Sequence, residues 1–250
     1  MQVVKQLHEH LIVERVREIR RRMPRVGGKK LYHMLGSDLR CMHTKTLGRD
    51  KFFDLLRRNE LLVRHRRKYV TTTNSQHRFY VYDNLITDLV IDRPNQVFVA
   101  DITYIRLPDS FCYLALITDV KSRKIVGHDL SMSLSIDGSL RTLCMALNGV
   151  ADPRGLIHHS DRGIQYCSHD YTSLLLSNDC RISMGESGNP YDNAIAERVN
   201  GILKQEFLLD CTFPDFVTAQ KAVREAIETY NTFRPHLSLD YDTPALRYAA

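Results

Sequence analysis

Three acidic residues between positions 101 and 197 have the side-chain type and setting of a catalytic site. Asp101 interrupts the apolar stretch VFVADITYIRL, and Asp161 follows a short run that ends in IHHS. A carboxylate within an apolar strand is costly unless a cation or hydrogen bonds stabilise it. Glu197 lies in a third segment, AIAERVNGILKQEF. These acids are the first candidates for chemistry.

Two aspartates and a glutamate from different elements form a set of hard oxygen donors. Such donors suit Mg²⁺ or Mn²⁺, which also accept water and substrate phosphates as ligands. Two such ions about 3.5–4 Å apart can activate an attacking hydroxyl and stabilise the leaving oxygen at phosphorus. If the three acids meet, the pattern predicts phosphodiester chemistry with two divalent ions.

Other kinds of site explain these residues less well. Ser160, His159 and Asp161 are adjacent, and neighbouring side chains on an extended chain point in different directions. A zinc site at His158 and His159 lacks partners at zinc-ligand spacing. A two-carboxylate glycosidase is conceivable, but the third acid and the basic N-terminal segment count against it. A solvated polar loop would explain Asp161 alone but not Asp101.

Apolar periodicity predicts the elements that must position the acids. We expect strands at 97–107, 113–120, 125–131, 155–159 and 181–184, and helices at 135–150, 168–178 and 215–233. The helix at 168–178 has a serine, Ser168, as its predicted cap. This order indicates an α/β sheet with helices packed on it. Asp161 falls just past a strand end, where such sheets place their sites.

The helix that carries Glu197 has a clear predicted start, with Asn189 as N-cap and Pro190 at its first position. At 100° per residue its apolar side chains share one face. These side chains are Ile195, Ala196, Val199, Ile202, Leu203 and Phe207.

The polar side chains of this helix divide into two groups. Glu197 and Lys204 lie opposite the apolar face, with Asn193 and Asn200 on its flanks. Glu206 projects toward the apolar side, and we expect it to be a buried, paired structural carboxylate.

The N-terminal 70 residues are strongly basic. They hold 19 Lys and Arg against 7 Asp and Glu, whereas the rest of the chain has a net charge of −6. A basic segment suits a polyanion because phosphate contacts release condensed counterions. A solvated charged surface is the alternative.

Three short helices are predicted in this segment. The first ends near Pro24, the second covers 29–35, and the third runs from a cap at Thr44 or Thr46 to Asn59. Together they predict a helix-turn-helix-like DNA-binding unit over 1–70. A basic and polar linker over 71–94 and an α/β domain over 95–250 follow.

Cysteine usage and apolar run lengths indicate an intracellular protein. The six cysteines are scattered without a C-x-x-C pattern, which favours reduced thiols. No apolar run approaches the roughly 20 residues of a membrane-spanning helix. The N-terminus lacks the apolar core of a signal peptide.

Several motifs resemble, in their order, the OrfB-type DDE transposases of insertion-sequence family three. Asp101 and Asp161 have 59 residues between them, and Asp161 and Glu197 have 35, which is this family's spacing. The motifs are DITYI (101–105), YLALITDVKSRKIVG (113–127), HHSDRGIQY (158–166), GNPYDNAIAE (188–197), LKQEF (203–207), YNTFRPH (230–236) and TP (243–244). The resemblance is strong over 95–248 and looser over 12–70.

Two positions depart from the family pattern. Phe98 stands where the family usually has tryptophan, and Gly185 stands where a serine is common. The first is a tolerable exchange of aromatic side chains. All three acids are intact, so the departures do not indicate an inactive enzyme.

The resemblance implies an RNase-H-like mixed sheet of the retroviral integrase type with flanking helices, preceded by a small all-α helix-turn-helix domain. It implies that Asp101, Asp161 and Glu197 are the catalytic residues and hold two Mg²⁺ or Mn²⁺ ions. The expected activity is DNA cleavage at the ends of an insertion sequence, followed by strand transfer. A DNA-binding regulator with an inactive core and a metal-dependent nuclease of the same fold are the alternatives.

The resemblance also implies contacts with DNA and with other chains. We expect Lys204 to contact DNA near the scissile phosphate, and His159 and Asn193 to orient the ligands or the DNA. Lys45 and Arg49 are expected DNA contacts in the N-terminal unit. A homo-oligomer, an upstream-frame transposase subunit and a location at the nucleoid in the bacterial cytoplasm are further expectations, with no membrane partner.

Overall fold

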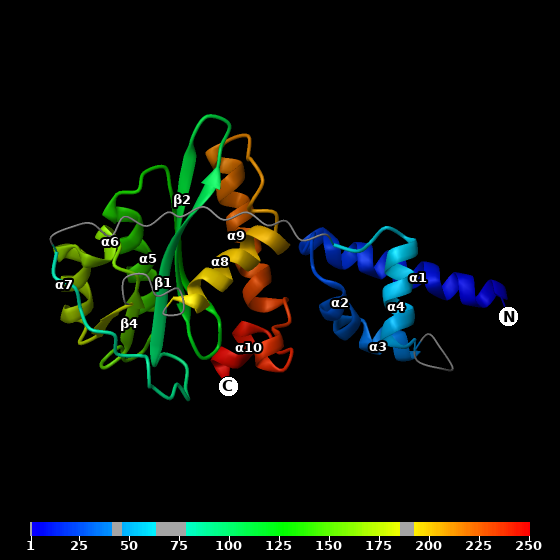
Figure 1. The fold of residues 1–250 in the computed structure, drawn as a ribbon, viewed down its shortest axis with the longest axis horizontal. Coiled ribbons are helices and arrows are strands. Elements are labelled where there is room, and N and C mark those ends of the chain that lie inside the picture. The colour runs from blue at the N-terminus through cyan, green and yellow to red at the C-terminus, as the bar shows by residue number, and fades with distance from the viewer. Residues whose placement is uncertain (1, 42–46, 64–78, 186–192) are drawn as a thin grey trace.

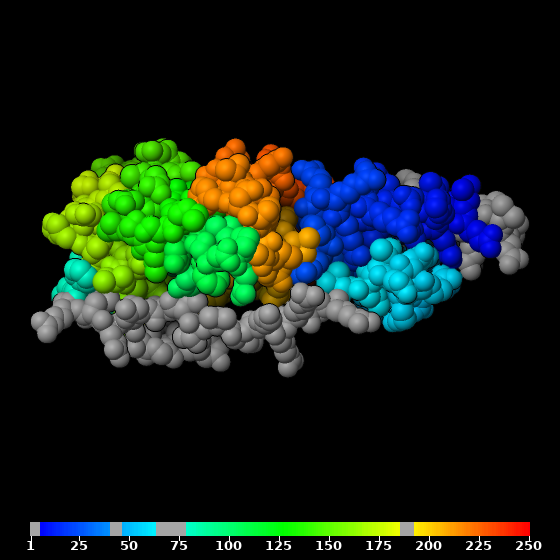
Figure 2. All heavy atoms as spheres, turned by 90° about the horizontal axis from the view of Figure 1, so that it is seen from above, coloured from blue at the N-terminus to red at the C-terminus, as the bar shows by residue number. Residues whose placement is uncertain are grey.

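The computed structural model describes residues 2–41, 47–63, 79–185 and 193–250. The molecule is elongated, with four N-terminal helices at one end and a sheet at the other (Figures 1 and 2). Helices α8 (Ala194–Glu206) and α9 (Phe216–Thr232) lie between the two ends, against the sheet.

The N-terminal helices are α1 (Gln2–Arg22), α2 (Gly28–Met34), α3 (Gly36–Cys41) and α4 (Arg49–Arg58). Helices α1, α2 and α4 correspond to the three predicted ones. Helix α3 was not predicted, because GSDLRC is too short and polar to show a helical period. The predicted caps Thr44 and Thr46 lie outside the described residues, and Gly48 precedes the first turn of α4.

These helices enclose an apolar core of their own. It is formed by buried side chains from all four helices and from the turns between them: Ile12, Val16, Met23, Leu31, Leu35, Leu39, Phe52 and Leu56. The same cluster continues into α8 and α9 through Leu203 and Ile227. The predicted helical unit is therefore packed against the rest of the chain. The boundaries of the three predicted domains stay predictions.

The sheet has five strands in the order β3-β2-β1-β4-β5. They are β1 (Val97–Arg106), β2 (Phe111–Asp119), β3 (Ile125–Ser131), β4 (Ile157–Ser160) and β5 (Arg181–Met184). The first three pair antiparallel, and β4 lies parallel to both β1 and β5. All five predicted strands are present, and the central position of β1 explains why its sequence is apolar on both faces.

Helices cover both faces of the sheet. Helices α5 (Ile136–Asn148) and α7 (His169–Ser177) enclose one apolar cluster with Phe98, and α8 and α9 cover the other face. The buried Phe98 fills the position where tryptophan is usual. Ser168 is the N-cap residue of α7, as predicted, but its hydroxyl accepts no helix amide and donates to the Gln165 carbonyl instead. The short helices α6 (Ile164–Cys167) and α10 (Pro244–Ala249) and the 3₁₀ turn Leu237–Leu239 were not predicted.

The described part of the predicted linker packs along the sheet. The Leu85 amide donates to Ser183 Oγ at 2.9 Å, and the Met184 amide donates to the Asp83 carbonyl at 3.3 Å. Leu85, Ile86 and Leu89 contact the buried cluster of β1 and β4. This segment therefore bonds to β5 and covers part of the α8 face of the sheet over β1 and β4.

Two expectations about the whole chain can be compared with its described part. Cysteines 112, 144, 167, 180 and 211 are free thiols. No helix within the described ranges has the length and apolarity needed to cross a membrane.

The close approach of α5 to β3 leads to a stability prediction. A Cβ at Gly127 would lie 2.3 Å from the Thr142 carbonyl oxygen of α5, so an alanine there must displace backbone. We expect Gly127→Ala to lower the free energy of unfolding by about 1–3 kcal/mol. Gly201→Ala is the control, because no described atom lies within 4 Å of its Cβ position. It should be neutral or stabilise α8 by up to about 1 kcal/mol. Equal denaturation midpoints for both variants would contradict this packing.

Candidate active site

The register of two parallel strands places the first two acids side by side. Val99 of β1 pairs with His159 of β4. Asp101 and Asp161 each follow two residues later, so the same register brings them level with each other. Alternation along the strands also puts both acids on the sheet face that α8 covers. The spatial meeting predicted for these two aspartates is what the strand pairing produces.

Asp101 is held by two hydrogen bonds and lies close to other negative charges. Asn200 Nδ2 donates to its Oδ2 at 2.7 Å, and the Ile102 amide donates to its Oδ1 at 2.9 Å. Burial raises the pKa of Asp101 to about 7, with a further contribution from the charge of Asp161 and a smaller one from Glu197. The two hydrogen bonds act in the opposite direction and favour the carboxylate.

Asp161 is fixed by the loop that follows β4. The Gly163 amide donates to Asp161 Oδ1 at 3.0 Å, and Arg162 Nε donates to the Gly185 carbonyl at 2.8 Å. Gly185, the second departure from the family pattern, thus receives a bond from the second-acid loop.

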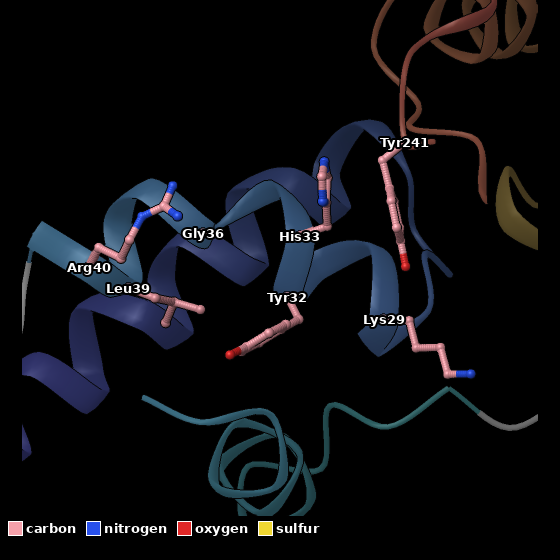
Figure 3. A pocket seen from close by; sticks show the side chains of 7 residues that line it. All are labelled: Lys29, Tyr32, His33, Gly36, Leu39, Arg40 and Tyr241. Carbon is pink, nitrogen blue, oxygen red and sulfur yellow. The ribbon is translucent and has the colours of Figure 1, made fainter. Parts of the chain in front are cut away.

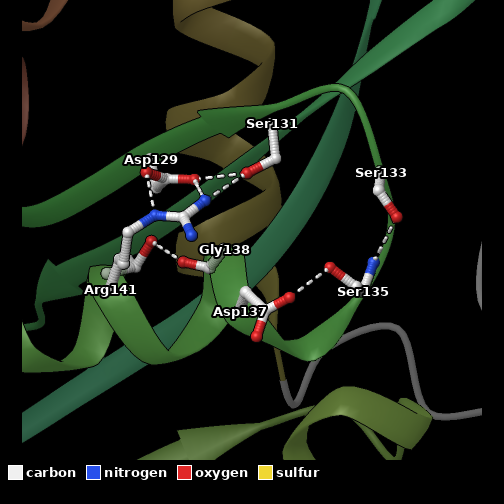
Figure 4. A network of polar contacts seen from close by, with 8 residues as sticks. Asp129, Ser131, Ser133, Ser135, Asp137, Gly138 and Arg141 are labelled. Atoms are coloured by element: carbon white, nitrogen blue, oxygen red, sulfur yellow. Dashed lines mark hydrogen bonds and ion pairs between the residues drawn. The ribbon is translucent and has the colours of Figure 1, made fainter.

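A polar network supports this loop from the neighbouring end of β3 (Figure 4). Arg141 of α5 makes two bonds to the Asp129 carboxylate, at 2.9 and 2.8 Å, and a third to Ser131 Oγ at 2.8 Å. Gln165, in the short helix α6 that directly follows the loop of Asp161, donates to the Leu134 carbonyl at 3.1 Å. The connection from β3 to α5 is therefore tied both to α5 and to the second-acid loop.

Glu197 lies in the first turn of α8 and is exposed. Its charge reaches Asp101, since it contributes to the raised pKa of that group. Within the described part of the chain, no three His, Cys, Asp or Glu side chains are grouped closely enough to hold a metal ion. The structure brings the two aspartates together and places Glu197 near them. The predicted start of its helix, Asn189 and Pro190, lies outside the described residues.

The carboxylates present fit a divalent cation. A raised pKa caused by burial and by a neighbouring carboxylate means that the ionised pair is unfavourable without a counter-charge. Oxygen donors of this kind are those that Mg²⁺ and Mn²⁺ prefer. Asp101 and Asp161 could hold such an ion, with Glu197 as the third donor.

Asn200 is a site residue that sequence reasoning did not single out. Periodicity placed it on a flank of the helix, but the structure buries it against Asp101. Its spacing of three residues after Glu197 was the available signal, because such residues are neighbours on a helix. Asn193, before the first turn of α8, donates to the Ala100 carbonyl at 3.2 Å and so ties the helix to β1.

Lys204 lies one turn beyond Asn200 and is half-buried. Burial lowers its pKa, while the charges of Asp101 and Asp210 act to raise it. Its ammonium group is therefore close enough to the acids to interact with them, as its place on the helix suggested. Its contact with DNA stays a prediction.

The two histidines after Ile157 project from opposite faces of the sheet. His159 is fully buried, with Nδ1 2.8 Å from Ser183 Oγ, so it can orient the site only from below its surface. His158 Nε2 lies 2.9 Å from the Tyr171 hydroxyl, and burial lowers the pKa of His158 to about 3. Rings on opposite faces of a strand cannot share a zinc ion, which agrees with the rejection of that site.

The basic N-terminal unit has two hollows on its surface. One, of about 340 Å³, is lined by Lys29, Tyr32, His33, Gly36, Leu39, Arg40 and Tyr241 (Figure 3). The other, of about 470 Å³, is lined by Lys29, Arg49, Asp50, Phe53, Asp54 and Arg57. The predicted contact Arg49 is thus exposed at a hollow surface of α4. The other predicted contact, Lys45, lies outside the described residues.

Comparison with known families and structures agrees with this architecture. Two family profiles described as "Integrase core domain" match residues 91–190 and 178–244. A chain of the simian T-cell lymphotropic virus intasome, solved with PP2A regulatory subunit B56 gamma, matches with a TM-score of 0.54 and 18% identity. The match covers 90% of this chain and 75% of the intasome chain. The magnesium-bound dimeric HTLV-2 integrase catalytic core matches with a TM-score of 0.50 and 18% identity. The match covers 63% of this chain and 98% of the HTLV-2 chain. These likenesses confirm the predicted integrase-type fold.

Relatives of higher identity define the family. The "uncharacterized 31 kDa protein" of insertion element IS600 from Shigella sonnei is 39% identical over 80% of this chain and 74% of its own length. The IS904 transposase of Lactococcus lactis is 41% identical over 60% of each chain. Transposase InsF of IS3A from Escherichia coli is 36% identical over 72% of this chain and 64% of its own.

The fold and the paired aspartates define an integrase-core protein of the DDE class. With these relatives, the chain belongs to the OrfB-type, InsF-like transposases of insertion-sequence family three. The chain matches less than two thirds of the length of the IS904 and IS3A transposases.

The electrostatic conflict at the aspartate pair gives a test by thermal unfolding. A pKa of about 7 in the folded protein means that stability falls as pH rises from about 4 to about 7, because ionising Asp101 costs more when folded. We expect Asp101→Asn to raise the unfolding temperature of the metal-free protein, and to raise it more at about pH 8 than at about pH 5.5.

The same assay reports metal binding without any catalytic step. Mg²⁺ should raise the unfolding temperature of the wild-type protein and leave that of Asp101→Asn unchanged. Asp152→Asn, which removes an exposed carboxylate paired with Arg154, should respond like the wild type. If neither Mg²⁺ nor Mn²⁺ stabilises the wild-type protein, the aspartate pair is not a metal site.

Proposed function

We propose that this protein cleaves DNA at the ends of an insertion sequence and transfers the released 3′ ends to target DNA, with divalent metal ions. The observation that carries the proposal is the Asp101–Asp161 pair, brought together by the β1–β4 register, in which burial and the charge of Asp161 raise the pKa of Asp101. Family membership supports the same activity.

Asp101, Asp161 and Glu197 would hold the metal ions. When bound, two ions supply activation of the attacking hydroxyl and stabilisation of the leaving oxygen. The remaining work belongs to the chain itself. Asn200 and the Ile102 amide fix the orientation of the Asp101 carboxylate. Lys204 provides a positive charge beside the acids, suited to a phosphodiester.

The N-terminal helical unit would hold the element end. Its net charge and its exposed arginines suit the phosphate backbone, and α4 presents Arg49 at a hollow surface. Strand transfer at two paired ends requires at least two catalytic centres, so we infer a homo-oligomer acting on nucleoid DNA in the bacterial cytoplasm. Membership of this transposase family makes an upstream-frame subunit a further proposed partner.

Loss of one metal-binding charge is the direct test of the proposed activity. We expect Asp101→Asn to abolish Mg²⁺-dependent cleavage and joining of an element-end oligonucleotide, because the metal loses a central ligand. DNA binding should remain, since the basic unit is untouched. Cleavage is measured on labelled duplexes and binding by fluorescence anisotropy.

The outcomes separate the proposal from its rivals. Joining by Asp101→Asn at the wild-type rate would end the proposal. Acid variants that behave as wild type in cells would indicate a DNA-binding regulator. Hydrolysis without any joined product, in a strand-transfer assay with wild-type protein, would indicate a nuclease of the same fold.

The role of the N-terminal unit is tested by the salt dependence of binding. If Arg49 neutralises a phosphate, Arg49→Ala should weaken binding of the element end and reduce the slope of log K against log salt by about one. Arg154→Ala is the matched control, because Arg154 is also exposed but lies before β4 and pairs with Asp152. An unchanged slope for Arg49→Ala would remove this residue from the DNA surface.

A further inference from the structure

A buried ion cluster joins the N-terminal unit to the helix of the third acid. The carboxylate of Glu206, the last residue of α8, accepts a hydrogen bond from Lys30 Nζ of α2 at 2.9 Å. It also accepts two hydrogen bonds from Arg234, which follows α9: one from Nε at 2.8 Å and one from Nη2 at 3.0 Å. Arg234 is only 2% exposed. The expectation that Glu206 is a paired carboxylate is therefore confirmed, and one of its partners comes from the other end of the molecule.

The ion cluster lowers the pKa of Glu206 below its usual value. Burial acts to raise the pKa, and the two cations with their hydrogen bonds outweigh that effect. Glu206 is therefore ionised at neutral pH, and its two oxygens are both engaged. A charged, bidentate arrangement of this kind fixes direction as well as distance.

Further contacts hold the same boundary between the N-terminal helices and the end of α8, which we call the seam. The Arg25 amide donates to the Glu206 carbonyl at 3.0 Å, and Arg25 Nη1 lies 3.0 Å from Asp210. One turn further along α2, the His33 ring stacks on Tyr241 with centroids 4.1 Å apart (Figure 3). The seam is thus bound at the end of α8 and again at the C-terminal segment.

Helix α8 links this seam to the catalytic acids. Asn200 holds Asp101 near the middle of the helix, Glu197 lies in its first turn and Glu206 at its last residue. Nine residues of α-helix separate Glu197 from Glu206 by about 14 Å, with no break in the described hydrogen-bond ladder. A rotation of the N-terminal unit about the seam would therefore displace α8, the helix that carries Glu197.

We propose that Glu206 is a positioning residue that, through Lys30, fixes the N-terminal unit relative to the catalytic acids and so selects the phosphodiester that is cut. This inference rests on the proposed function. DNA held by the N-terminal unit then reaches Asp101 and Asp161 in one register. The apolar packing of the seam supplies stability, and the ion pair supplies the angular constraint.

Lys30→Gln tests the proposal without leaving a buried charge unpaired, because Arg234 still pairs with Glu206. The matched control is Lys221→Gln, which removes the same charge from a 77% exposed position of α9, outside the basic N-terminal unit. Cleavage sites on an end-labelled duplex of the terminal repeat flanking the gene are mapped at single-nucleotide resolution. For Lys30→Gln we expect cleavage at the main site to fall about tenfold and to spread to neighbouring phosphodiesters, because small misplacements of substrate are costly.

A second readout does not depend on activity. Hydrogen exchange of the DNA-free protein should show faster exchange in the last turn of α8 for Lys30→Gln than for Lys221→Gln. Lys30→Arg, which restores the cation, should recover both the single cleavage site and the slow exchange. Affinity for the duplex should be equal in Lys30→Gln and Lys30→Arg.

The outcomes distinguish this inference from the proposed function. If Lys30→Gln cuts at the wild-type position and rate, the positioning role is wrong, even where Asp101→Asn confirms the activity. A uniform loss of rate at an unchanged position, not recovered by Lys30→Arg, also overturns it. If wild-type protein cuts no DNA with Mg²⁺ or Mn²⁺, the proposed function fails, and wild-type exchange rates in Lys30→Gln would independently overturn the coupling.

Discussion

Two carboxylates that the sheet forces together are the constraint on which the rest of this structure depends. The parallel pairing of β1 and β4 fixes Asp101 and Asp161 at the same level and on the same face. Asp101 is held within the central strand, and Asp161, just past the end of β4, is held by the Gly163 amide. Burial and the charge of Asp161 raise the pKa of Asp101 to about 7. The fold therefore holds an unfavourable pair of carboxylates that a divalent cation would stabilise.

The surrounding elements serve this pair in different ways. Helix α8 packs its apolar side chains on the sheet and inserts the amide of Asn200, whose Nδ2 reaches Asp101. The loop after β4 holds Asp161 with a backbone amide and is itself tied to the β3–α5 connection through Gln165. His159 braces β4 against β5 from inside the core. The site is therefore rigid where the aspartates lie and open at the start of α8, where Glu197 is exposed.

The molecule places its two proposed functions, DNA cleavage and DNA holding, at opposite ends of one helix. Helix α8 carries Glu197 near the sheet and Glu206 at the seam with the N-terminal helices (Figure 1). A carboxylate shared between cations of two structural units resists rotation better than apolar contact alone, because charged hydrogen bonds depend on direction. Such a joint suits an enzyme that must hold a DNA end with one unit and cut it with another.

The sequence by itself determined much of this arrangement. Apolar runs predicted all five strands, and the isolated acid Asp101 marked the centre of the sheet. Helical periodicity predicted the buried face of α8, of which Ala196, Val199, Ile202 and Leu203 are buried. These features were predictable because each depends on residues that are near one another along the chain.

Only the tertiary structure decided the partners of the polar side chains. Helical periodicity predicts Asn200 only as a residue on the flank of α8. Its contact with Asp101 exists because α8 packs against β1. Glu206 meets Lys30, which is 176 positions away, and no local pattern encodes that contact. The short helix α3 was also missed, since six mostly polar residues carry no period. Periodicity reports which side of an element is buried, whereas pairing between elements depends on how those sides pack in three dimensions.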